Sequence, residues 1–394
     1  MKPLATDRES VFSAAVELRR RLHAHPETAF EEVATAGAVA ERMRARGFAV
    51  RTGLGRTGVS ALYDTGVDGP TVLLRADLDA LPVAEETGLP YAAGNGNMHA
   101  CGHDGHVAAL DAAADLLLLD PPRRGRVVFA FQPAEEGAGG AKAMIADGVL
   151  DPEPDVAFGV HLWTALPLGV VGVTPGPMMA AVDEFRIDIS GPGGHAASPH
   201  EARDAIVAAA QVITALQTVV SRRLSPLQPA VVSVTSVHGG SAFNVLPGSV
   251  VLTGTCRAFD KEAYDRLPTL VEATAMAAAA TLGCEAKVNY KRSNEALIND
   301  AGEASRCWGL AERLLGPGRV TRDCRTMGGE DFAEFLTRVP GAFAFVGAAR
   351  PEEGLGPAHH SPTFDFDERA MATAARLHEA VARDVLAQGK VLPI

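Results

Sequence analysis

Apolar residues near the start of the chain recur at helical spacing. Val11, Leu18 and Leu22 fall on one side of a helix that begins after Asp7, since residues three, four and seven positions apart share a helix face. A second helix is predicted to end at Gly47, because glycine commonly follows the last turn of a helix. The chain is therefore expected to begin with two helices.

The pattern then alternates between short apolar runs and helical stretches. The runs 71–75, 127–132 and 156–161 are bounded by Gly, Pro or Asp, as buried strands are, and a helix is predicted over 105–119. Strands that alternate with helices are typical of α/β proteins with parallel strands. We expect an α/β domain with a mixed, largely parallel sheet flanked by helices.

Polar side chains follow each of these strands. They are Asp77, Asp79, Glu135, Glu136 and His161. In open α/β sheets the ligand crevice lies outside the carboxyl ends of the strands. The sequence therefore predicts that these side chains converge.

The rhythm changes from 179 to 292. Strands and helices are predicted there in the order β-α-β-β-α-β, at 185–189, 202–224, 231–237, 249–257, 262–282 and 284–290. This order is typical of a ferredoxin-like domain. Beyond it the pattern predicts helices at 303–315, 330–336 and 367–386, and a strand at 342–347. We expect a discontinuous catalytic domain, 1–178 and 293–394, interrupted by an inserted α+β domain, 179–292.

Composition restricts the partners of the chain. Of its 394 residues, 47% are hydrophobic and 21% are charged, which is typical of a globular protein. The net charge is −12, from 36 basic and 48 acidic residues, and it argues against nucleic acid or an anionic membrane surface as the main partner. A small-molecule or protein partner is favoured.

Segments for membrane insertion or export are not expected. No run of 18 apolar residues occurs, and the apolar stretch 107–119 is interrupted by Asp111 and Asp115. Residues 7–9 are charged where a signal peptide would need its apolar segment. We expect a cytoplasmic protein with no membrane partner. Its five cysteines are odd in number and scattered, so reduced thiols are expected.

The densest group of potential metal ligands is the segment His99–His106. Cys101 and His103 stand two residues apart on a loop that contains Gly102, so both can turn toward one cation. A thiolate and an imidazole together favour zinc or a similar transition metal. The alternative is a polar loop with an incidental thiol.

A second group follows the strand at 127–132. Adjacent carboxylates at Glu135 and Glu136 are costly beside a buried strand unless a cation or a proton neutralises them. The alternative is a solvated turn. Further candidates, each typical of ordinary core or surface positions, are Asp77, Asp79, His161, His359 and His360. Taken together, the two groups and these residues supply enough ligands for two metal ions.

Eight motifs occur in order along nearly the whole chain. They are Arg21-Leu22-His23-Ala24-His25-Pro26-Glu27, Arg75-Ala76-Asp77-Leu78-Asp79-Ala80-Leu81-Pro82, Cys101-Gly102-His103-Asp104, Gln132-Pro133-Ala134-Glu135-Glu136-Gly137, Gly194-His195-Ala196 with Pro199, Asn244-Val245-Leu246-Pro247-Gly248, Gly329-Glu330-Asp331-Phe332 and His360-Ser361-Pro362. In these motifs the chain resembles the hippurate hydrolase, N-acyl-amino-acid amidohydrolase and auxin-conjugate hydrolase family of dinuclear metallopeptidases.

The resemblance implies a set of metal ligands and a general base. The implied ligands are Cys101, His103, Glu136, His161 and His360. Cys101 would bridge the two ions, and Glu135 would be the general base. Relatives outside this group carry a His-x-Asp ligand pair where this chain has Asp77 and Asp79, so Asp77 is not assigned as a ligand. Asp79 is expected to orient the site.

The resemblance also implies functional residues in the inserted domain. His195 matches a histidine that reaches the neighbouring active site across a dimer and stabilises the oxyanion. Asn244, Arg257 and Gly329 match substrate-binding positions, and Arg257 offers a two-pronged donor for a carboxylate. Without the resemblance, His195 could be a turn histidine and Arg257 a surface charge.

The resemblance thus predicts an N-acyl-amino-acid amidohydrolase that acts through a hydroxide shared by two metal ions, with Glu135 as general base. Zinc is the expected metal, with manganese, cobalt and nickel as alternatives. A homodimer through the inserted domain is expected, with a tetramer as the alternative. Three other functions stay open: a dipeptidase or carboxypeptidase of the same superfamily, a hydrolase with Cys101 as nucleophile activated by His103 or His106, and a non-catalytic binding protein.

Overall fold

The computed structural model describes residues 1–350, 354 and 356–388, and the chain divides into two compact units. The first unit contains Met1–Met178, Ile298–Arg325 and the chain from Asp331 onward. The second contains Met179–Leu297 and Thr326–Glu330. The second unit therefore runs five residues beyond the expected boundary at 292. It also includes the segment 326–330, which the sequence pattern places in the catalytic domain.

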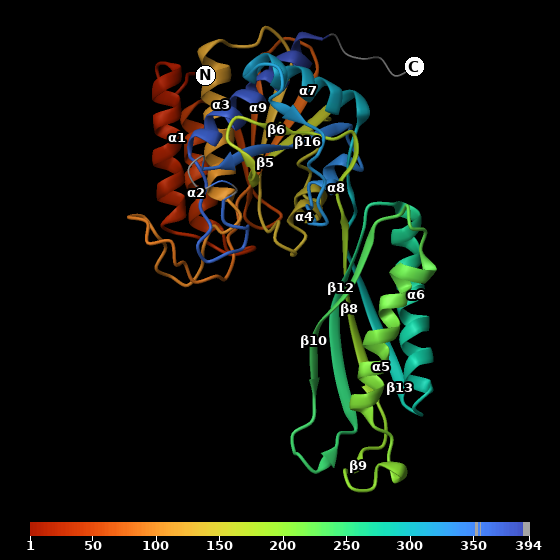
Figure 1. Cartoon of the computed structure of the whole chain (residues 1–394). Helices are drawn as coiled ribbons and strands as arrows, with labels where there is room; N and C mark the ends of the chain where they lie inside the picture. Colours follow the sequence, from red (N-terminus) through yellow and green to blue (C-terminus); the bar gives the residue numbers. More distant parts are fainter. Residues whose placement is uncertain (351–353, 355, 389–394) are drawn as a thin grey trace. The chain divides into compact units, whose positions relative to one another are not determined.

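An eight-stranded sheet forms the centre of the first unit, in the order β1-β2-β4-β3-β5-β16-β6-β15 (Figure 1). The strands are β1 (Ala49–Leu54), β2 (Gly58–Asp64), β3 (Thr71–Asp77), β4 (Arg126–Gln132), β5 (Val156–Pro167), β6 (Val171–Gly172), β15 (Val320–Thr321) and β16 (Gly341–Ala349). The four central strands β4, β3, β5 and β16 are parallel. Every residue of β3 and β16 is buried, as in parallel strands that helices cover on both faces. The predicted α/β class is confirmed.

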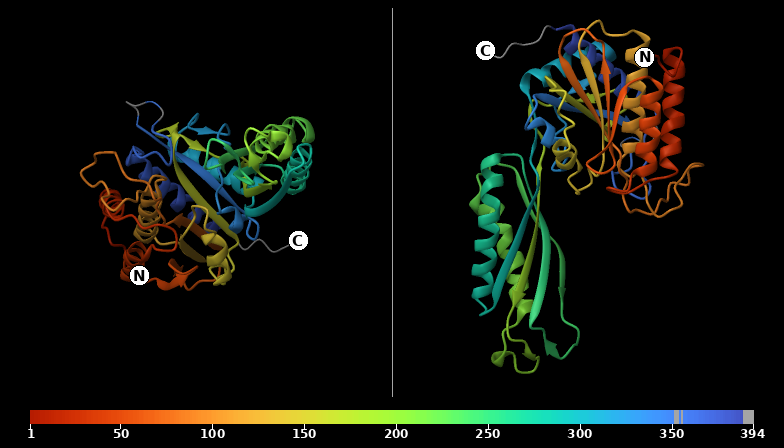
Figure 2. Two further views of the ribbon diagram at one scale, coloured as in Figure 1. Left: turned by 90° about the horizontal axis from the view of Figure 1, so that it is seen from below. Right: turned by 180° about the vertical axis from the view of Figure 1, so that it is seen from behind.

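Helices flank this sheet (Figure 2). They are α1 (Arg8–His23), α2 (Val33–Ala45), α3 (His103–Leu119), α4 (Gly140–Ala146), α7 (Ala301–Leu315), α8 (Ala333–Leu336) and α9 (Arg369–Ala387). α3 packs between α1 and α9, and it is buried along nearly its whole length. Its two interior carboxylates, Asp111 and Asp115, each pair with Arg46 at 2.8 Å. The polar interruptions of the apolar stretch 107–119 are therefore internal ion pairs.

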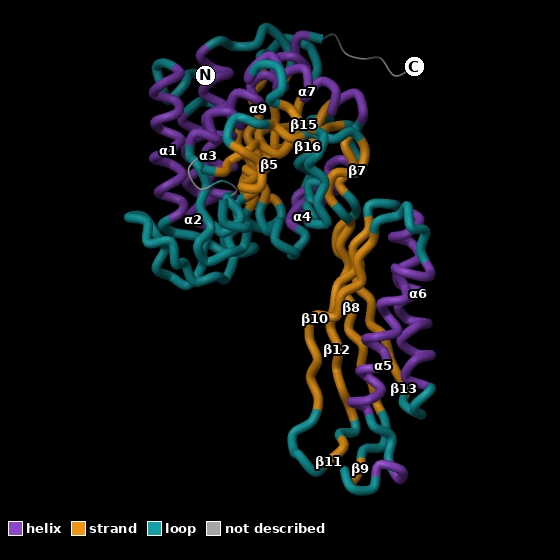
Figure 3. The backbone as a smooth tube through the Cα atoms, in the orientation of Figure 1, coloured by secondary structure: helices purple, strands orange, loops and turns teal. Residues whose placement is uncertain are grey.

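The second unit has the ferredoxin-like order that the sequence predicts. Its elements are β8 (Ala181–Ser190), α5 (Ala205–Thr218), β10 (Ala230–Gly239), β12 (Ser249–Ala258), α6 (Lys261–Ala280) and β13 (Glu285–Asn294). They form an antiparallel sheet in the order β10-β12-β8-β13, with α5 and α6 packed on each other and on the sheet. Two short strands, β9 (Gly194–His195) and β11 (Val245–Leu246), pair at one end of this sheet (Figure 3). β7 (Gly176–Met179) pairs with β14 (Leu297–Asn299).

One helical stretch among the described residues, Ala205–Arg223, is long and apolar enough to cross a membrane by length and composition alone. Polar residues such as Gln211 and Gln217 interrupt it, so it is not a run of 18 consecutive apolar residues. The signal is weak, because core helices of soluble proteins meet the same criterion. The side of α5 that carries Ala208, Val212 and Leu216 is fully buried in the core of its own unit.

His378 on α9 is a buried histidine without a hydrogen-bond partner among the described residues. Both ring nitrogens are buried and unbonded, and the ring meets Phe158 edge-on at 5.4 Å. Burial lowers the pKa of His378 to about 3. The folded protein therefore holds this ring neutral at pH values where the unfolded chain protonates it.

We expect His378→Leu to raise the free energy of unfolding by about 1–3 kcal/mol at pH 8, since it removes a buried polar group that has no partner. The gain should grow by about 2 kcal/mol at pH 5, because wild-type stability falls as the pH drops from the unfolded pKa near 6.5 toward the folded pKa. Chemical denaturation at the two pH values measures both effects. A gain that does not change with pH would contradict the assigned neutral state.

Candidate metal centre

The segment that carries Cys101 and His103 turns sharply into α3. Gly102, between them, has φ +86°, a left-handed conformation that glycine adopts without steric cost. The Cys101 Sγ, a nitrogen of His103 and a nitrogen of His161 all lie within 4.8 Å of one another. The turn therefore brings a thiol and two imidazoles together at the carboxyl end of the sheet.

All five side chains that the resemblance implies as ligands belong to one cluster. Cys101 Sγ lies 3.4 Å from His161 Nε2, and Glu136 Oε1 lies 3.1 Å from His360 Nε2. Two groups of three potential ligands share Cys101: one with His103 and His161, the other with Glu136 and His360. The thiol thus stands between two potential metal positions, as a bridging ligand would.

Hydrogen bonds fix the orientation of two of these imidazoles. His103 Nδ1 lies 2.8 Å from the carbonyl oxygen of Asp79, and His161 Nδ1 lies 2.8 Å from the carbonyl oxygen of Leu162. A carbonyl only accepts, so each Nδ1 carries the proton and each Nε2 keeps its lone pair for a cation. The Asp79 carboxylate also accepts the N–H of Glu136 at 3.0 Å. Asp79 therefore contacts two potential ligands, which fits the orienting role expected for it.

The donor set fits cations on two grounds. First, the buried His103 Nε2 has no hydrogen bond to any described residue, and it lies 4.0 Å from Glu136 Oε1. Buried polar atoms of this kind are costly unless a partner binds them. Second, sulfur, imidazole nitrogen and carboxylate oxygen are the ligands that zinc and similar ions take in proteins.

The carboxylates of the cluster also favour bound positive charge, either protons or cations. Burial would lower the pKa of His103, but the carboxylates of Asp77, Asp79 and Glu136 outweigh it and raise the pKa to about 10. Burial raises the pKa of the Cys101 thiol well above its usual value, and nearby carboxylates raise it further. Without metal the cluster retains protons, and a cation competes with them for the same lone pairs.

Two residues beside the cluster have left-handed backbones without being glycine. Ala134, which precedes Glu135, has φ +53°, and His360 has φ +68°. The Ala134 N–H donates to Glu32 Oε1 at 2.8 Å, and the His360 N–H donates to the Ala100 carbonyl at 2.8 Å. Such conformations cost of order 1–3 kcal/mol and persist where surrounding contacts enforce them. The contacts here aim Glu135 and His360 at the cluster.

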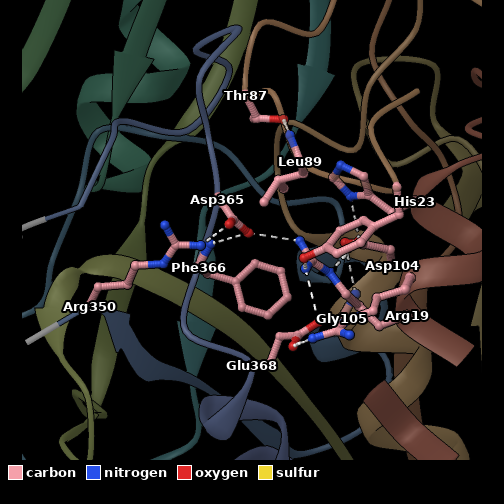
Figure 4. Close-up of polar contacts among 12 residues, drawn as sticks. Arg19, His23, Thr87, Leu89, Asp104, Gly105, Arg350, Asp365, Phe366 and Glu368 are labelled. Carbon is pink, nitrogen blue, oxygen red and sulfur yellow. Dashed lines mark hydrogen bonds and ion pairs between the residues drawn. The ribbon is translucent and has the colours of Figure 1, made fainter. Parts of the chain in front are cut away.

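A buried ion network that the sequence did not reveal joins two of the ligand segments (Figure 4). Arg19 on α1 donates to Asp104 at 2.9 Å, to Asp365 at 2.9 Å and to Glu368 at 3.1 Å. Asp104 follows the potential ligand His103, and Asp365 lies in the segment after His360. The available signal was the position of Arg19 on the apolar side of the first predicted helix, three residues before Leu22.

The substrate residues predicted in the second unit lie at opposite ends of its sheet. His195 is exposed on β9, and its partner Val245 on β11 directly follows Asn244. Arg257 lies near the other end of β12, paired with Val182, and a Cβ on Gly329 would be 3.6 Å from Arg257 Nη1. Ser249 and Arg257 are eight residues apart on β12, so the two ends are separated by about 26 Å.

Comparisons with known proteins agree on the family. Residues 73–384 match the model of peptidase family M20/M25/M40. The chain is 40% identical to an N-acetyl-L-cysteine deacetylase of Bacillus subtilis (93% of this chain, 87% of the relative). It is 37% identical to an IAA-amino acid hydrolase ILR1-like 4 of Arabidopsis thaliana (97% and 88%). Its fold is similar to the crystal structure of Bacillus subtilis YXEP, a dinuclear metal binding peptidase from the M20 family, with TM-score 0.82 and 34% identity (96% and 99%).

Proposed function

The chain belongs to peptidase family M20/M25/M40 and is a metal-dependent amidohydrolase of that family, and from this premise we propose that it hydrolyses the amide bond of N-acyl amino acids. The observation that carries the proposal is the cluster in which the buried Cys101 is shared by two groups of potential ligands. Its relatives include a protein named for removal of an acetyl group from an amino acid.

In this proposal two divalent cations are held by five side chains. These are Cys101, His103, Glu136, His161 and His360. The ions are zinc, or manganese, cobalt or nickel where these are more available, because the mixed sulfur, nitrogen and oxygen set accepts all four. When bound, such ions lower the pKa of water to about 7 and polarise a carbonyl oxygen.

Glu135 is the proton carrier in this scheme. Its carboxylate lies within 4.8 Å of ligand atoms of His103 and Glu136, and the residue is only 8% exposed. Glu135 takes the proton of the attacking water and delivers it to the nitrogen of the departing amino acid. His195 donates a hydrogen bond to the oxygen of the reacting carbonyl.

Arg257 is proposed to bind the carboxylate of the amino acid. It is half-buried, burial lowers its pKa, and it has no ion pair with a described residue. A half-buried guanidinium without a carboxylate partner is suited to bind one from a substrate. Asn244 and Gly329 complete the proposed set of substrate contacts.

A substrate panel tests the proposed function. Acetyl, benzoyl and long-chain acyl amino acids are compared with their carboxamides and with free dipeptides, on protein loaded with each metal. We expect hydrolysis of acyl amino acids, with kcat/KM for a carboxamide at least about tenfold lower because the Arg257 contact is lost. Preferential cleavage of free dipeptides would favour the dipeptidase alternative. No turnover of any compound with metal bound would favour a binding protein.

His195 and Arg257 of one chain cannot contact the same small substrate, because about 26 Å of β12 separates their ends of the sheet. If both bind one acyl amino acid, they come from two copies of the chain. This supports the homodimer proposed from the resemblance, in which the partner subunit's His195 completes each site.

Mixing two inactive variants tests this arrangement. A dimer of one Glu135→Gln chain and one His195→Ala chain contains one site with both residues intact if His195 acts across the dimer. After dissociation and random reassociation we expect about a quarter of wild-type activity, since half of the dimers are mixed and each has one good site. If His195 acts within its own chain, no activity returns.

A nucleophilic Cys101 is disfavoured by the site. Burial and nearby carboxylates raise the pKa of the thiol, whereas a nucleophilic cysteine needs a lowered one. Both nitrogens of His106 are bonded, to Asp77 and to the Leu162 N–H, so this ring has no free nitrogen to activate a thiol.

We expect chelation to abolish activity and added metal to restore it, since the proposed chemistry needs the ions. Alkylating agents should react slowly with Cys101 before and after chelation, because the metal holds the thiolate in the loaded protein, and burial and nearby carboxylates keep the thiol protonated in the metal-free protein. Activity that survives metal removal but not alkylation would establish the nucleophile instead.

A further inference from the structure

His106 connects three elements beside the metal cluster, although it is not among the ligands that the resemblance implies. It lies on α3, one turn after His103, and is 1% exposed. Its Nδ1 is 2.6 Å from Oδ1 of Asp77, the last residue of β3. Its Nε2 is 2.9 Å from the backbone nitrogen of Leu162 on β5. One ring therefore bridges α3, β3 and β5.

These two contacts determine the protonation of the ring. A backbone N–H can only donate, so the Nε2 that receives it carries no proton. The single ring proton is then on Nδ1 and is donated to the Asp77 carboxylate, which also accepts from Arg75 at 2.8 Å. His106 is a neutral linker whose donor and acceptor are both used.

The His106 ring connects β3 and β5 beyond the last backbone pair between these strands. β3 and β5 pair as far as Arg75 and Gly159, and no further pair between them is formed by the described residues. Beyond that point Asp77 and Leu162 are connected through the His106 ring. The side chain therefore connects the last residue of β3, Asp77, to β5, which carries the potential ligand His161.

The Leu162 backbone also contacts a potential ligand and the neighbour of another. Its carbonyl oxygen lies 2.8 Å from Nδ1 of His161 and 3.1 Å from Nε2 of His359. His359 immediately precedes the potential ligand His360. A shift of the Leu162 backbone would therefore turn the His161 ring.

α3 and β5 approach too closely at this point for another arrangement. A Cβ placed on Gly105 would lie 2.6 Å from the Leu162 side chain and 2.5 Å from the Phe366 ring. Only a glycine leaves room for this approach. α3 and β5 are therefore in close contact next to His106.

We propose that His106 is a positioning residue that fixes the separation between His103 on α3 and His161 on β5, which belong with Cys101 to one group of potential ligands for a single cation. The inference rests on the ligand set of the proposed function. His106 itself contacts neither metal nor substrate. It acts through Asp77 and through the Leu162 peptide.

Three substitutions of His106 distinguish a side chain that positions its neighbours from one that only fills space. His106→Leu keeps the volume but leaves Asp77 without a donor and the Leu162 N–H without an acceptor. His106→Gln offers one donor and one acceptor on a side chain long enough to reach both partners, and His106→Asn offers the same groups on a shorter one. His378→Leu is the matched control, because it replaces a buried histidine that has no hydrogen bond to a described residue.

The readout is binding of two zinc equivalents in competition with a chromophoric chelator, together with the visible spectrum of the cobalt-loaded protein. We expect one of the two equivalents, the one that His103 and His161 would hold, to lose about 10–100-fold in affinity in the Leu and Asn variants, with an altered cobalt spectrum. His106→Gln should recover most of that affinity, and His378→Leu should bind like wild type.

Wild-type affinity and spectrum in the Leu or Asn variant would overturn the proposal. If the Leu variant does not fold, the Asn and Gln variants decide, and equal affinities in these two would also overturn it. A loss as large in His378→Leu, which removes no hydrogen bond to a described residue, would show that the effect does not come from the two hydrogen bonds of His106 and would also overturn the proposal. The measurement uses no substrate, so it is independent of whether acyl amino acids are hydrolysed.

Discussion

Glu135→Gln is expected to keep both metal ions and to lower kcat by about 10²–10⁴-fold, because a carboxamide cannot take up the proton of the attacking water. The substitution keeps the shape of the side chain and leaves the ligand Glu136 in place. KM should change little, since Glu135 is not expected to hold the substrate. The measurement is steady-state kinetics with metal content determined on the same samples.

Glu41→Gln is the matched control for this variant, because Glu41 is an exposed residue of α2 far along the chain from the cluster. It should have wild-type kinetics and metal content. Near-normal turnover by the Glu135→Gln variant with two ions bound would remove Glu135 from its role as base. Loss of metal in that variant would instead make Glu135 a ligand.

Arg19→Leu is expected to destabilise the protein by about 3–5 kcal/mol, because it leaves the buried carboxylate of Asp104 without its guanidinium partner and removes one guanidinium partner of Asp365, which also pairs with Arg350. Arg19 is 1% exposed, so water cannot replace it in the folded protein. Metal affinity should fall as well, since Asp104 and Asp365 belong to the segments that carry the potential ligands His103 and His360. Urea denaturation and metal titration measure the two effects.

Arg20→Leu provides the comparison within the same helix turn. Arg20 is half-exposed, and its ion pair among the described residues is with Glu368 at 2.6 Å, so its loss should cost no more than about 1 kcal/mol. Equal losses of stability at the two positions would show that the buried network around Arg19 contributes no more to the free energy of unfolding than the exposed ion pair of Arg20.

The elements with strong periodicity could be predicted from the sequence. The helix expected over 105–119 is α3, and the β-α-β-β-α-β order of the second unit is the order observed. β6 and β15 are two residues long, too short to show any periodicity, and only their neighbours in the sheet define them. The segment 326–330 joins the second unit through contacts distant in sequence, which no local pattern records.

Most of the candidate site was accessible from residue types and motif order. Carboxylates and imidazoles after buried strands converge, as the position of strand ends in an α/β sheet predicts. Arg19 and His106 were missed as network residues because their importance lies in buried partners far along the chain, Asp365 and Leu162 among them. A charged or polar residue on an apolar helix face is the only sequence signal for such contacts.

The most direct test of the two-metal site is anomalous X-ray scattering from crystals of the metal-loaded protein. We predict two ions, each within about 2.0–2.3 Å of its ligands, with Cys101 Sγ bonded to both. Histidine ligands should bind through the Nε2 atoms that the hydrogen bonds of His103 and His161 leave free. A single ion, or ions bound away from Cys101, would contradict the proposed site.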